Sequence, residues 1–276
     1  MQYGIEIVPF GEFGEPQVVV QLAQAAEAAG WEAVWVWDHL AFPYGVGDPW
    51  VLLTAVATTT TQIKLLPGVA ALPRYKPHLL ARLLTSLDRL STDDFILGAG
   101  MGALHEFTSV GEAGDYKTRA AMLDEGLDLL TRIWSGQPVT HHGAHYTVND
   151  LTFLPQPIQQ PRIPIWIGGD SAAALRRAAQ WDGWIMGTVD ENCVTTTTPA
   201  QIGECVAAIR QQRTSDAPFA IAVNGVSQPN ETAHVRAYEA AGATWWFEAV
   251  LGCLSVDEML AGVCRRSTLS LCAAAY

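Results

Sequence analysis

The chain has few basic residues and lacks the motifs of several common enzyme classes. It carries 16 Lys and Arg against 28 Asp and Glu, a formal net charge of −12 at pH 7. Phosphates would be repelled unless a basic patch intervened, and the sequence shows no such patch. We therefore expect no nucleic-acid partner and no anionic membrane surface. No serine lies in a GxSxG context, so serine hydrolase chemistry is not indicated.

Cysteine pairs and long apolar runs are also lacking. The five cysteines are an odd number and form no CxxC pair. This favours incidental thiols in a reducing compartment over a disulfide framework or a metal site. The N-terminus, MQYGIEIVPF, has no basic region followed by a long apolar stretch, and no window approaches the roughly 18 apolar residues that span a bilayer. A cytoplasmic protein is the expectation.

Short apolar runs alternate with segments of helical period along the whole chain. Hydrophobic residues make up 49% of the 276 residues, enough to bury a large core. Alternation of strands with helices predicts a parallel sheet with right-handed crossovers. Eight such units favour a (β/α)8 TIM barrel, and residues 1–276 are expected to form one domain. The expected strands lie at 3–8, 32–37, 63–69, 94–100, 164–169, 183–187, 219–225 and 244–250.

Helix signals occur at the expected places between these strands. Asp48 and Thr198 each precede a proline, as a capping residue precedes the first helical position. Residues 255–258, SVDE, have the spacing of a capping box. One apolar helix face, expected to pack on the barrel, is formed by Leu80, Leu83, Leu84 and Leu87.

A proline-rich excursion separates the fourth barrel unit from the fifth. Its prolines forbid a continuous helix, whereas VTHHGAHYTV predicts a hairpin that turns at Gly143. The excursion carries His141, His142 and His145, which could suggest a metal site. Hairpin side chains usually face solvent and no strand-end carboxylate lies near in sequence, so no metal is expected.

The run VWVWDHL, residues 34–40, ends abruptly on Asp38 and His39. A strand buried on both faces is typical of parallel sheets covered by helices, and barrel enzymes place their sites at the carboxyl ends of such strands. Two interpretations stay open. Either Asp38 caps a turn and His39 packs beneath the loop, or both bind a cofactor, with His39 as a proton donor or hydrogen-bond partner for a bound ring and Asp38 close to the cofactor. Adjacent residues of an extended chain point to opposite sides, so only one is expected to face the barrel centre.

Glycine follows most of the expected strands. It brings backbone amides close to a ligand, although strand-to-helix turns also use glycine for geometry alone. Gly168 and Gly169, just before Asp170 and Ser171, suggest a phosphate site on backbone amides. The pair belongs to neither a GxGxxG nor a GKS loop, so a dinucleotide fold is not indicated.

Five collinear segments resemble the bacterial luciferase-like monooxygenase superfamily, whose members are flavin- or deazaflavin-dependent TIM-barrel oxidoreductases. The resemblance covers most of residues 3–250. It implies an oxidoreductase or monooxygenase that acts on a small organic substrate with FMN or the deazaflavin coenzyme F420, and the sequence does not choose between the two cofactors. The segments are AAEAAGWEAVWVWDHL, PWVLLTAVATTTTQIKLLPGV, LLTSLDRLSTDDFILGAGMG, LDEGLDLLTRIWSGQPV and LPQPIQQPRIPIWIGGDSAAALRRAAQWDGW.

The resemblance also implies roles for individual residues. Asp38 and His39 match an Asp-His pair whose histidine faces the flavin ring, which makes His39 the candidate catalytic residue. Gly68 and Val69 match the bulge in the third strand that backs the ring. The turn after the fourth strand corresponds to Gly100, Met101 and Gly102, and the loops that receive the phosphate and ribityl chain correspond to Gly168, Gly169, Gly187 and Thr188.

One departure from the family concerns an acid. Deazaflavin-dependent sugar-phosphate dehydrogenases of the superfamily carry a glutamate just after the strand-four glycines, where this chain has Ala103. His105 and Glu106 follow and could replace that acid. The missing acid makes sugar-phosphate oxidation doubtful and keeps an alternative open, a non-catalytic flavin-binding barrel or a heterodimer subunit. A homodimer is a further possibility, since members of the superfamily often dimerise.

Overall fold

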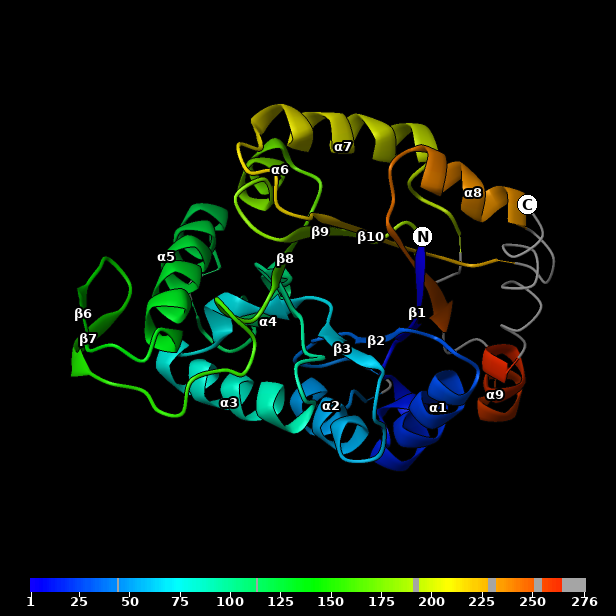
Figure 1. The fold of residues 1–276 in the computed structure, drawn as a ribbon, viewed down its shortest axis with the longest axis horizontal. Helices are drawn as coiled ribbons and strands as arrows, with labels where there is room; N and C mark the ends of the chain where they lie inside the picture. The colour runs from blue at the N-terminus through cyan, green and yellow to red at the C-terminus, as the bar shows by residue number, and fades with distance from the viewer. Residues whose placement is uncertain (44, 113, 191–193, 228–231, 251–254, 265–276) are drawn as a thin grey trace.

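The predicted eight-stranded parallel barrel is confirmed (Figure 1). The computed structural model describes residues 1–43, 45–112, 114–190, 194–227, 232–250 and 255–264. Its main sheet has the order β3-β2-β1-β11-β10-β9-β8-β5-β4. The strands are β1 (Gln2–Ile7), β2 (Ala33–Val36), β3 (Lys64–Pro67), β4 (Ala70–Ala71), β5 (Leu97–Gly100), β8 (Ile165–Gly168), β9 (Gly183–Met186), β10 (Ala220–Gly225) and β11 (Trp245–Val250).

Two short strands make up the third barrel strand. The expected strand at 63–69 is interrupted at Gly68–Val69, where the peptide bond is cis, so that β3 and β4 lie on either side. Leu65 forms a parallel bridge with Phe95, and its amide donates to the carbonyl of Asp94 at 2.8 Å. This contact brings β3 against the segment that leads into β5 and closes the barrel.

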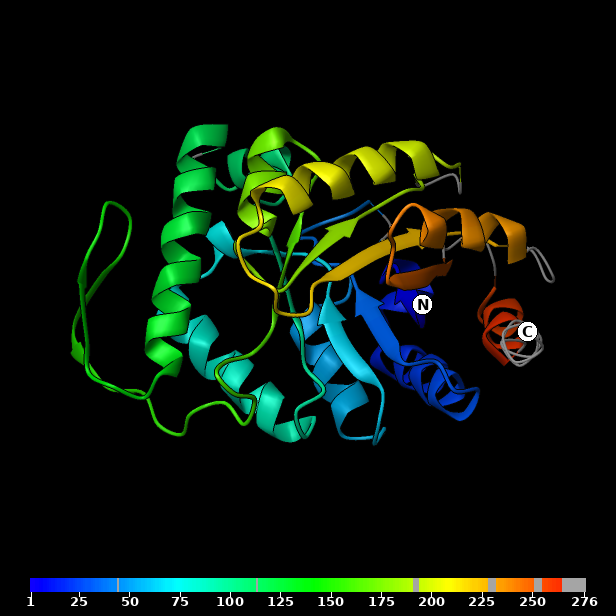
Figure 2. The ribbon, with the colours of Figure 1, turned by 45° about the horizontal axis from the view of Figure 1, so that its top comes forward.

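Helices surround the barrel, as Figures 1 and 2 show. The predicted caps are confirmed, because Asp48, Thr198 and Ser255 each accept a hydrogen bond from a backbone amide of the following helix. Short 3-10 turns occur at Gly11–Gly14 and Leu72–Arg74. The helices are α1 (Pro16–Ala28), α2 (Pro49–Ala57), α3 (Pro77–Leu90), α4 (Leu104–Thr108), α5 (Tyr116–Trp134), α6 (Ala172–Ala178), α7 (Pro199–Gln212), α8 (Thr232–Ala240) and α9 (Val256–Val263).

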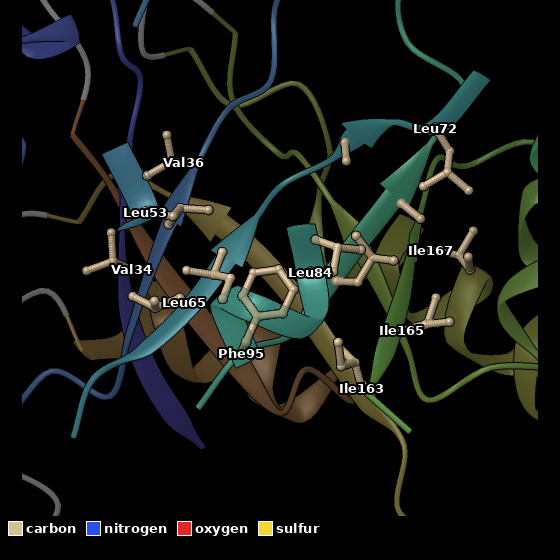
Figure 3. Packing of buried hydrophobic residues seen from close by; sticks show 14 of the residues in the cluster. Val34, Val36, Leu53, Leu65, Leu72, Leu84, Phe95, Ile163, Ile165 and Ile167 are labelled. Carbon is tan, nitrogen blue, oxygen red and sulfur yellow. The ribbon is translucent and has the colours of Figure 1, made fainter. Parts of the chain in front are cut away.

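Apolar side chains fill the layer between strands and helices, part of which Figure 3 shows. On α3, Leu80, Leu84 and Leu87 are buried as predicted. The expectation for Leu83 is wrong, because 36% of its surface is exposed at the edge of the packed face. A second cluster fills the barrel interior with Trp35, Leu66, Ile96, Trp166, Ile185, Trp245 and Phe247.

The predicted hairpin in the excursion is confirmed as β6 (Val139–His142) paired with β7 (Thr147–Leu151). It stands away from the barrel beside α5 (Figure 1). Glu125 of α5 accepts from His141 Nε2 at 2.9 Å and from the amide of Tyr146 at 2.8 Å. The histidine therefore ties the hairpin to α5. In the ranges that the structure describes, no group of His, Cys, Asp and Glu is placed to hold a metal.

Other features expected from the sequence lie partly outside the described ranges. Cys193, Cys253 and Cys272 belong to those parts of the chain. Cys205 and Cys264, which the structure describes, are free thiols. Among the described residues, no helix has the length and apolar character needed to cross a membrane.

A buried carboxylate ties the excursion back to α3. Asp88 is fully buried, and it accepts from the amide of Ile158 at 2.6 Å and from Gln159 Nε2 at 2.7 Å. A buried donor that loses its acceptor costs about 1–3 kcal/mol. This carboxylate should therefore contribute to stability although it lies far from the barrel mouth.

We predict that Asp88→Asn lowers the free energy of unfolding by about 1–3 kcal/mol, because the new amide group offers one acceptor fewer to the same donors. Urea denaturation measures the change. Asp128→Asn is the matched control, since the Asp128 side chain is 64% exposed and should contribute less than about 0.5 kcal/mol. Equal losses in the two variants would contradict the role of Asp88.

Candidate active site

A cavity of about 430 Å³ opens at the carboxyl ends of the barrel strands. Ten of the eleven residues singled out from the sequence line it, and Thr188 is the exception. Both Asp38 and His39 belong to the lining, because β2 ends at Val36 and the residues after it no longer alternate as a strand does. The expectation that only one of the two side chains faces the barrel centre stays a prediction. The lining consists of Glu6, Trp35, Trp37, Asp38, His39, Gly68, Val69, Gly100, Met101, Gly102, Ala103, Gly168, Gly169, Ile185, Gly187, Val189 and Asn224.

The side chain of Val69 lies between two strand-end glycines. A Cβ atom on Gly100 would come within 2.5 Å of Val69 Cγ2, and one on Gly168 within 2.7 Å of Val69 Cγ1. Trp35 Nε1 donates to the carbonyl of Gly68 at 2.5 Å, and a Cβ on Gly68 would overlap that indole. The glycines are therefore required by the close approach of Val69 and Trp35.

Gly187 differs from these glycines because it borders open space. A Cβ atom there would meet only Asn224 Oδ1, at 3.9 Å. Asn224 Oδ1 accepts from the amide of Thr188, and Asn224 also accepts from the Thr188 hydroxyl through its backbone carbonyl. Thr188 is fully buried and supports the loop from beneath, while Gly187 faces the cavity.

Gly169 has both of its backbone polar groups engaged. Its carbonyl accepts from Trp184 Nε1 at 2.7 Å, and its amide donates to the carbonyl of Ile185 at 3.4 Å. Its φ of +109° is a conformation that side-chain-bearing residues rarely adopt. Ser171 accepts from the amide of Ala174 and begins α6. The turn that joins Gly169 to α6 therefore follows directly on a cavity-lining residue.

Asp38 is held by three donors. Its carboxylate accepts from the amide of Ala71 at 2.9 Å, from the Tyr75 hydroxyl at 3.0 Å and from Arg74 Nη2. Burial, together with the negative charge of Asp38, raises the pKa of Tyr75, so the phenol stays a donor. Asp38 is only 7% exposed and acts as an anchor between β2 and β4.

His39 is positioned by a buried glutamate on α4, the short helix that follows β5. Glu106 is 2% exposed, and it contacts His39 Nδ1 at 3.0 Å, the amide of Leu40 at 2.7 Å and Arg74 Nη1 at 2.9 Å. With Nδ1 engaged, Nε2 is the ring nitrogen left for a ligand in the cavity. Ala103 also lines the cavity, and Glu106 supplies a carboxylate beside the histidine.

Arg74 joins the two carboxylates into one cluster. Burial lowers the pKa of its guanidinium, but the charges of Asp38 and Glu106 outweigh that effect and raise it above its ordinary value. Arg74 and Tyr75 were not singled out from the sequence, since no local pattern links them to residue 38 or 106.

Glu6 is a site residue that the sequence analysis missed. It is fully buried, lines the cavity, and accepts from Trp37 Nε1 at 2.5 Å and from Asn224 Nδ2 at 2.6 Å. Burial raises its pKa from 4.5 to about 7, against the lowering effect of the two donors. A charged residue inside the apolar strand YGIEIV was the signal that could have revealed it.

Comparisons with known proteins identify the family and the fold. A family model described as luciferase-like monooxygenase matches residues 8–254. An F420-dependent hydroxymycolic acid dehydrogenase of Mycobacterium tuberculosis is 31% identical over 68% of this chain and 54% of its own length. An F420-dependent glucose-6-phosphate dehydrogenase of Amycolatopsis mediterranei is 32% identical over 63% of this chain and 54% of its own. The chain thus spans about half the length of both relatives.

Two solved structures share the fold over almost the entire chain. A monooxygenase of Streptomyces bottropensis has a TM-score of 0.81 with 19% identity, over 99% of this chain and 100% of its own. The coenzyme F420-dependent tetrahydromethanopterin reductase of Methanopyrus kandleri has a TM-score of 0.79 with 17% identity, over 98% and 99% of the two chains.

The raised pKa of Glu6 predicts a pH-dependent stability term. Between pH 4.5 and about 7 the folded state binds more protons at Glu6 than the unfolded state does, so stability falls as pH rises through that window and then levels off. Glu6→Gln removes the term. Relative to this variant, the wild type should lose about 2–3 kcal/mol of unfolding free energy between about pH 5 and about pH 8. Urea denaturation of both proteins at the two pH values measures their free energies of unfolding. If the difference between wild type and Glu6→Gln were the same at both pH values, the raised pKa assigned to Glu6 would be contradicted.

Proposed function

Because the chain belongs to the luciferase-like monooxygenase family, we propose that it is a flavin- or deazaflavin-dependent oxidoreductase that binds its cofactor in the cavity at the barrel mouth. FMN and coenzyme F420 are the two candidate cofactors, and a small organic molecule is the substrate. The observation that carries the proposal is the cavity of about 430 Å³, which is lined by Val69 and by glycines at the strand ends. The fold alone would not suffice, since barrels host many unrelated activities.

The lining residues fit a flat, phosphorylated cofactor. We assign Gly68 and Val69 to one face of the ring, because both line the cavity and Val69 projects between the strand-end glycines Gly100 and Gly168. Gly100, Met101 and Gly102 border the ring edge. Arg119 holds this turn in place, donating through Nη1 to the carbonyls of Met101 and Gly102.

The phosphate and ribityl chain are assigned to the opposite strands. Gly168 and Gly169 end β8, and the amides that follow Gly169 offer donors to an anion. Gly187 leaves space for the chain. Thr188 lies beneath Gly187, and a direct contact of Thr188 with the cofactor stays a prediction.

When bound, such a cofactor supplies either hydride transfer, as a deazaflavin, or oxygen activation, as reduced FMN. The protein's own contribution is orientation and proton handling. His39 Nε2 is placed to hold a hydrogen bond or a proton at the reacting group of the substrate, while Glu106 keeps the ring in one orientation. Glu6 is a second group near the cavity that can exchange a proton close to neutrality.

A catalytic role agrees better with this site than a storage role. The alternative of a non-catalytic flavin-binding barrel rested on Ala103 in place of an acid. Glu106 brings a carboxylate to His39 from only three residues further along the chain.

Self-association as a homodimer stays a prediction. The exposed apolar side chains of Val51 on α2 and of Leu79 and Leu83 on α3 are candidates for such a contact.

We predict that His39→Ala lowers turnover by about 10²–10⁴-fold while cofactor affinity changes little, because the imidazole acts on the substrate. Turnover is followed as the substrate-dependent change in cofactor absorbance over a panel of small alcohols, aldehydes and ketones. His142→Ala on the exposed hairpin is the matched control and should retain activity. Full activity of the His39 variant would exclude the role assigned to it.

We also predict that Gly187→Val weakens cofactor binding by at least about tenfold, a loss of about 1.4 kcal/mol, while the fold is retained. The new side chain would meet little protein and would occupy the cavity instead. Fluorescence titration with FMN and with coenzyme F420 measures the affinity. Gly262→Val on α9 is the control, because a Cβ there meets no atom within 4 Å and Gly262 does not line the cavity. Equal affinities in both variants would contradict the proposed cofactor position.

A further inference from the structure

Among the residues that the structure describes, the cavity is lined by acidic side chains and by no Lys or Arg. Its ionisable lining residues are Glu6, Asp38 and His39. Arg74, the cation next to this lining, is held between Asp38 and Glu106. With a neutral His39, the cluster of Asp38, Glu106 and Arg74 carries a net charge of −1, so Arg74 does not offer a site to an anionic substrate.

A phosphate beside His39 would face the carboxylates of Asp38 and Glu106, whose two negative charges share the single counter-ion Arg74. Like charges at close range in a partly buried site disfavour binding.

The mouth is apolar and aromatic on the side of His39. Trp37 and His39 line the cavity, and Phe10 and Phe42 continue the surface outward. Phe10 stacks on Phe42 with ring centroids 4.0 Å apart, and Phe42 meets His39 edge-on at 5.1 Å. Phe10 and Phe42 are both half-buried.

Aliphatic residues extend the same surface. Val189 lines the cavity and packs with Phe10 and Trp37 in a small cluster that also contains Val8 and Ala249. Leu40, next to His39, is 46% exposed. Exposed apolar surface that surrounds a site with few polar groups is typical of a binding surface for an apolar ligand.

We propose that the substrate is an uncharged molecule with an apolar body, which packs against the aromatic surface of Phe10, Trp37 and Phe42 with its hydroxyl or carbonyl group at His39. The inference rests on the proposed function and defines its substrate class. It excludes sugar phosphates and other anions from the position beside His39. The phosphate of the cofactor is accommodated elsewhere, by backbone amides at the end of β8.

The test compares two probes of similar ring size on the protein loaded with whichever cofactor it binds in the oxidised state. Cyclohexanol represents the neutral class and glucose 6-phosphate the anionic class. Isothermal titration calorimetry measures binding of each probe without requiring turnover. We expect cyclohexanol to bind with a dissociation constant at least about tenfold lower than that of glucose 6-phosphate. Tighter binding of glucose 6-phosphate would overturn the inference.

Variants separate packing from charge. Phe42→Ala should weaken cyclohexanol binding by about tenfold and leave cofactor affinity unchanged. The matched control is Phe219→Ala, which should alter neither affinity. Phe219 directly precedes β10, at the end of that strand away from the cavity, and Arg213 covers its ring. Unchanged cyclohexanol binding in a folded Phe42 variant would overturn the inference.

A second variant tests the electrostatic part on an exposed position. Leu40→Lys places a cation beside His39 and should increase affinity for glucose 6-phosphate by about tenfold, because it compensates the carboxylates. No gain would contradict exclusion by charge. Loss of the proposed function would look different, since neither FMN nor coenzyme F420 would then bind at all.

Discussion

The organisation of the site depends on one guanidinium, that of Arg74. It lies between two buried carboxylates, Asp38 after β2 and Glu106 on α4. Breaking a buried ion pair by removing one partner costs about 3–5 kcal/mol, because a charge is left in the interior without its counter-ion. Asp38 also accepts from the amide of Ala71, and Glu106 also contacts His39. The same cation therefore holds the strand that follows Gly68–Val69 and the orientation of the imidazole.

The mouth of the barrel has two chemically different halves. Around Val69 and the ends of β5 and β8 the surface consists of glycine backbone, which suits a flat ring and a phosphate. Around His39 it consists of aromatic and aliphatic side chains with two carboxylates. A cofactor and an apolar substrate can then lie side by side with His39 at the boundary, which is where a proton must be handled in a two-electron reaction.

The barrel strands could be predicted because strands that are buried on both faces have continuous apolar sequences, here bounded by glycine and proline. The position of Gly143 likewise revealed the hairpin. Partners far apart in sequence could not be found, such as Arg74 with Glu106, since nothing local signals an ion pair across strand ends. Glu6 is a charged residue within the apolar run YGIEIV. It was missed because the sequence does not show which face of that strand points into the closed barrel. Asp38 and His39 share the cavity because β2 ends before them, a boundary that period-two alternation does not reveal.

A crystal structure of the protein grown with FMN or with coenzyme F420 tests the central claim most directly. The account predicts that the ring lies on Val69 between the ends of β5 and β8, with its phosphate at the turn after Gly169 and His39 Nε2 facing the open side of the ring. A ring bound on the other side of the mouth, against Phe10 and Phe42, or a cavity that stays empty at saturating cofactor, would contradict it.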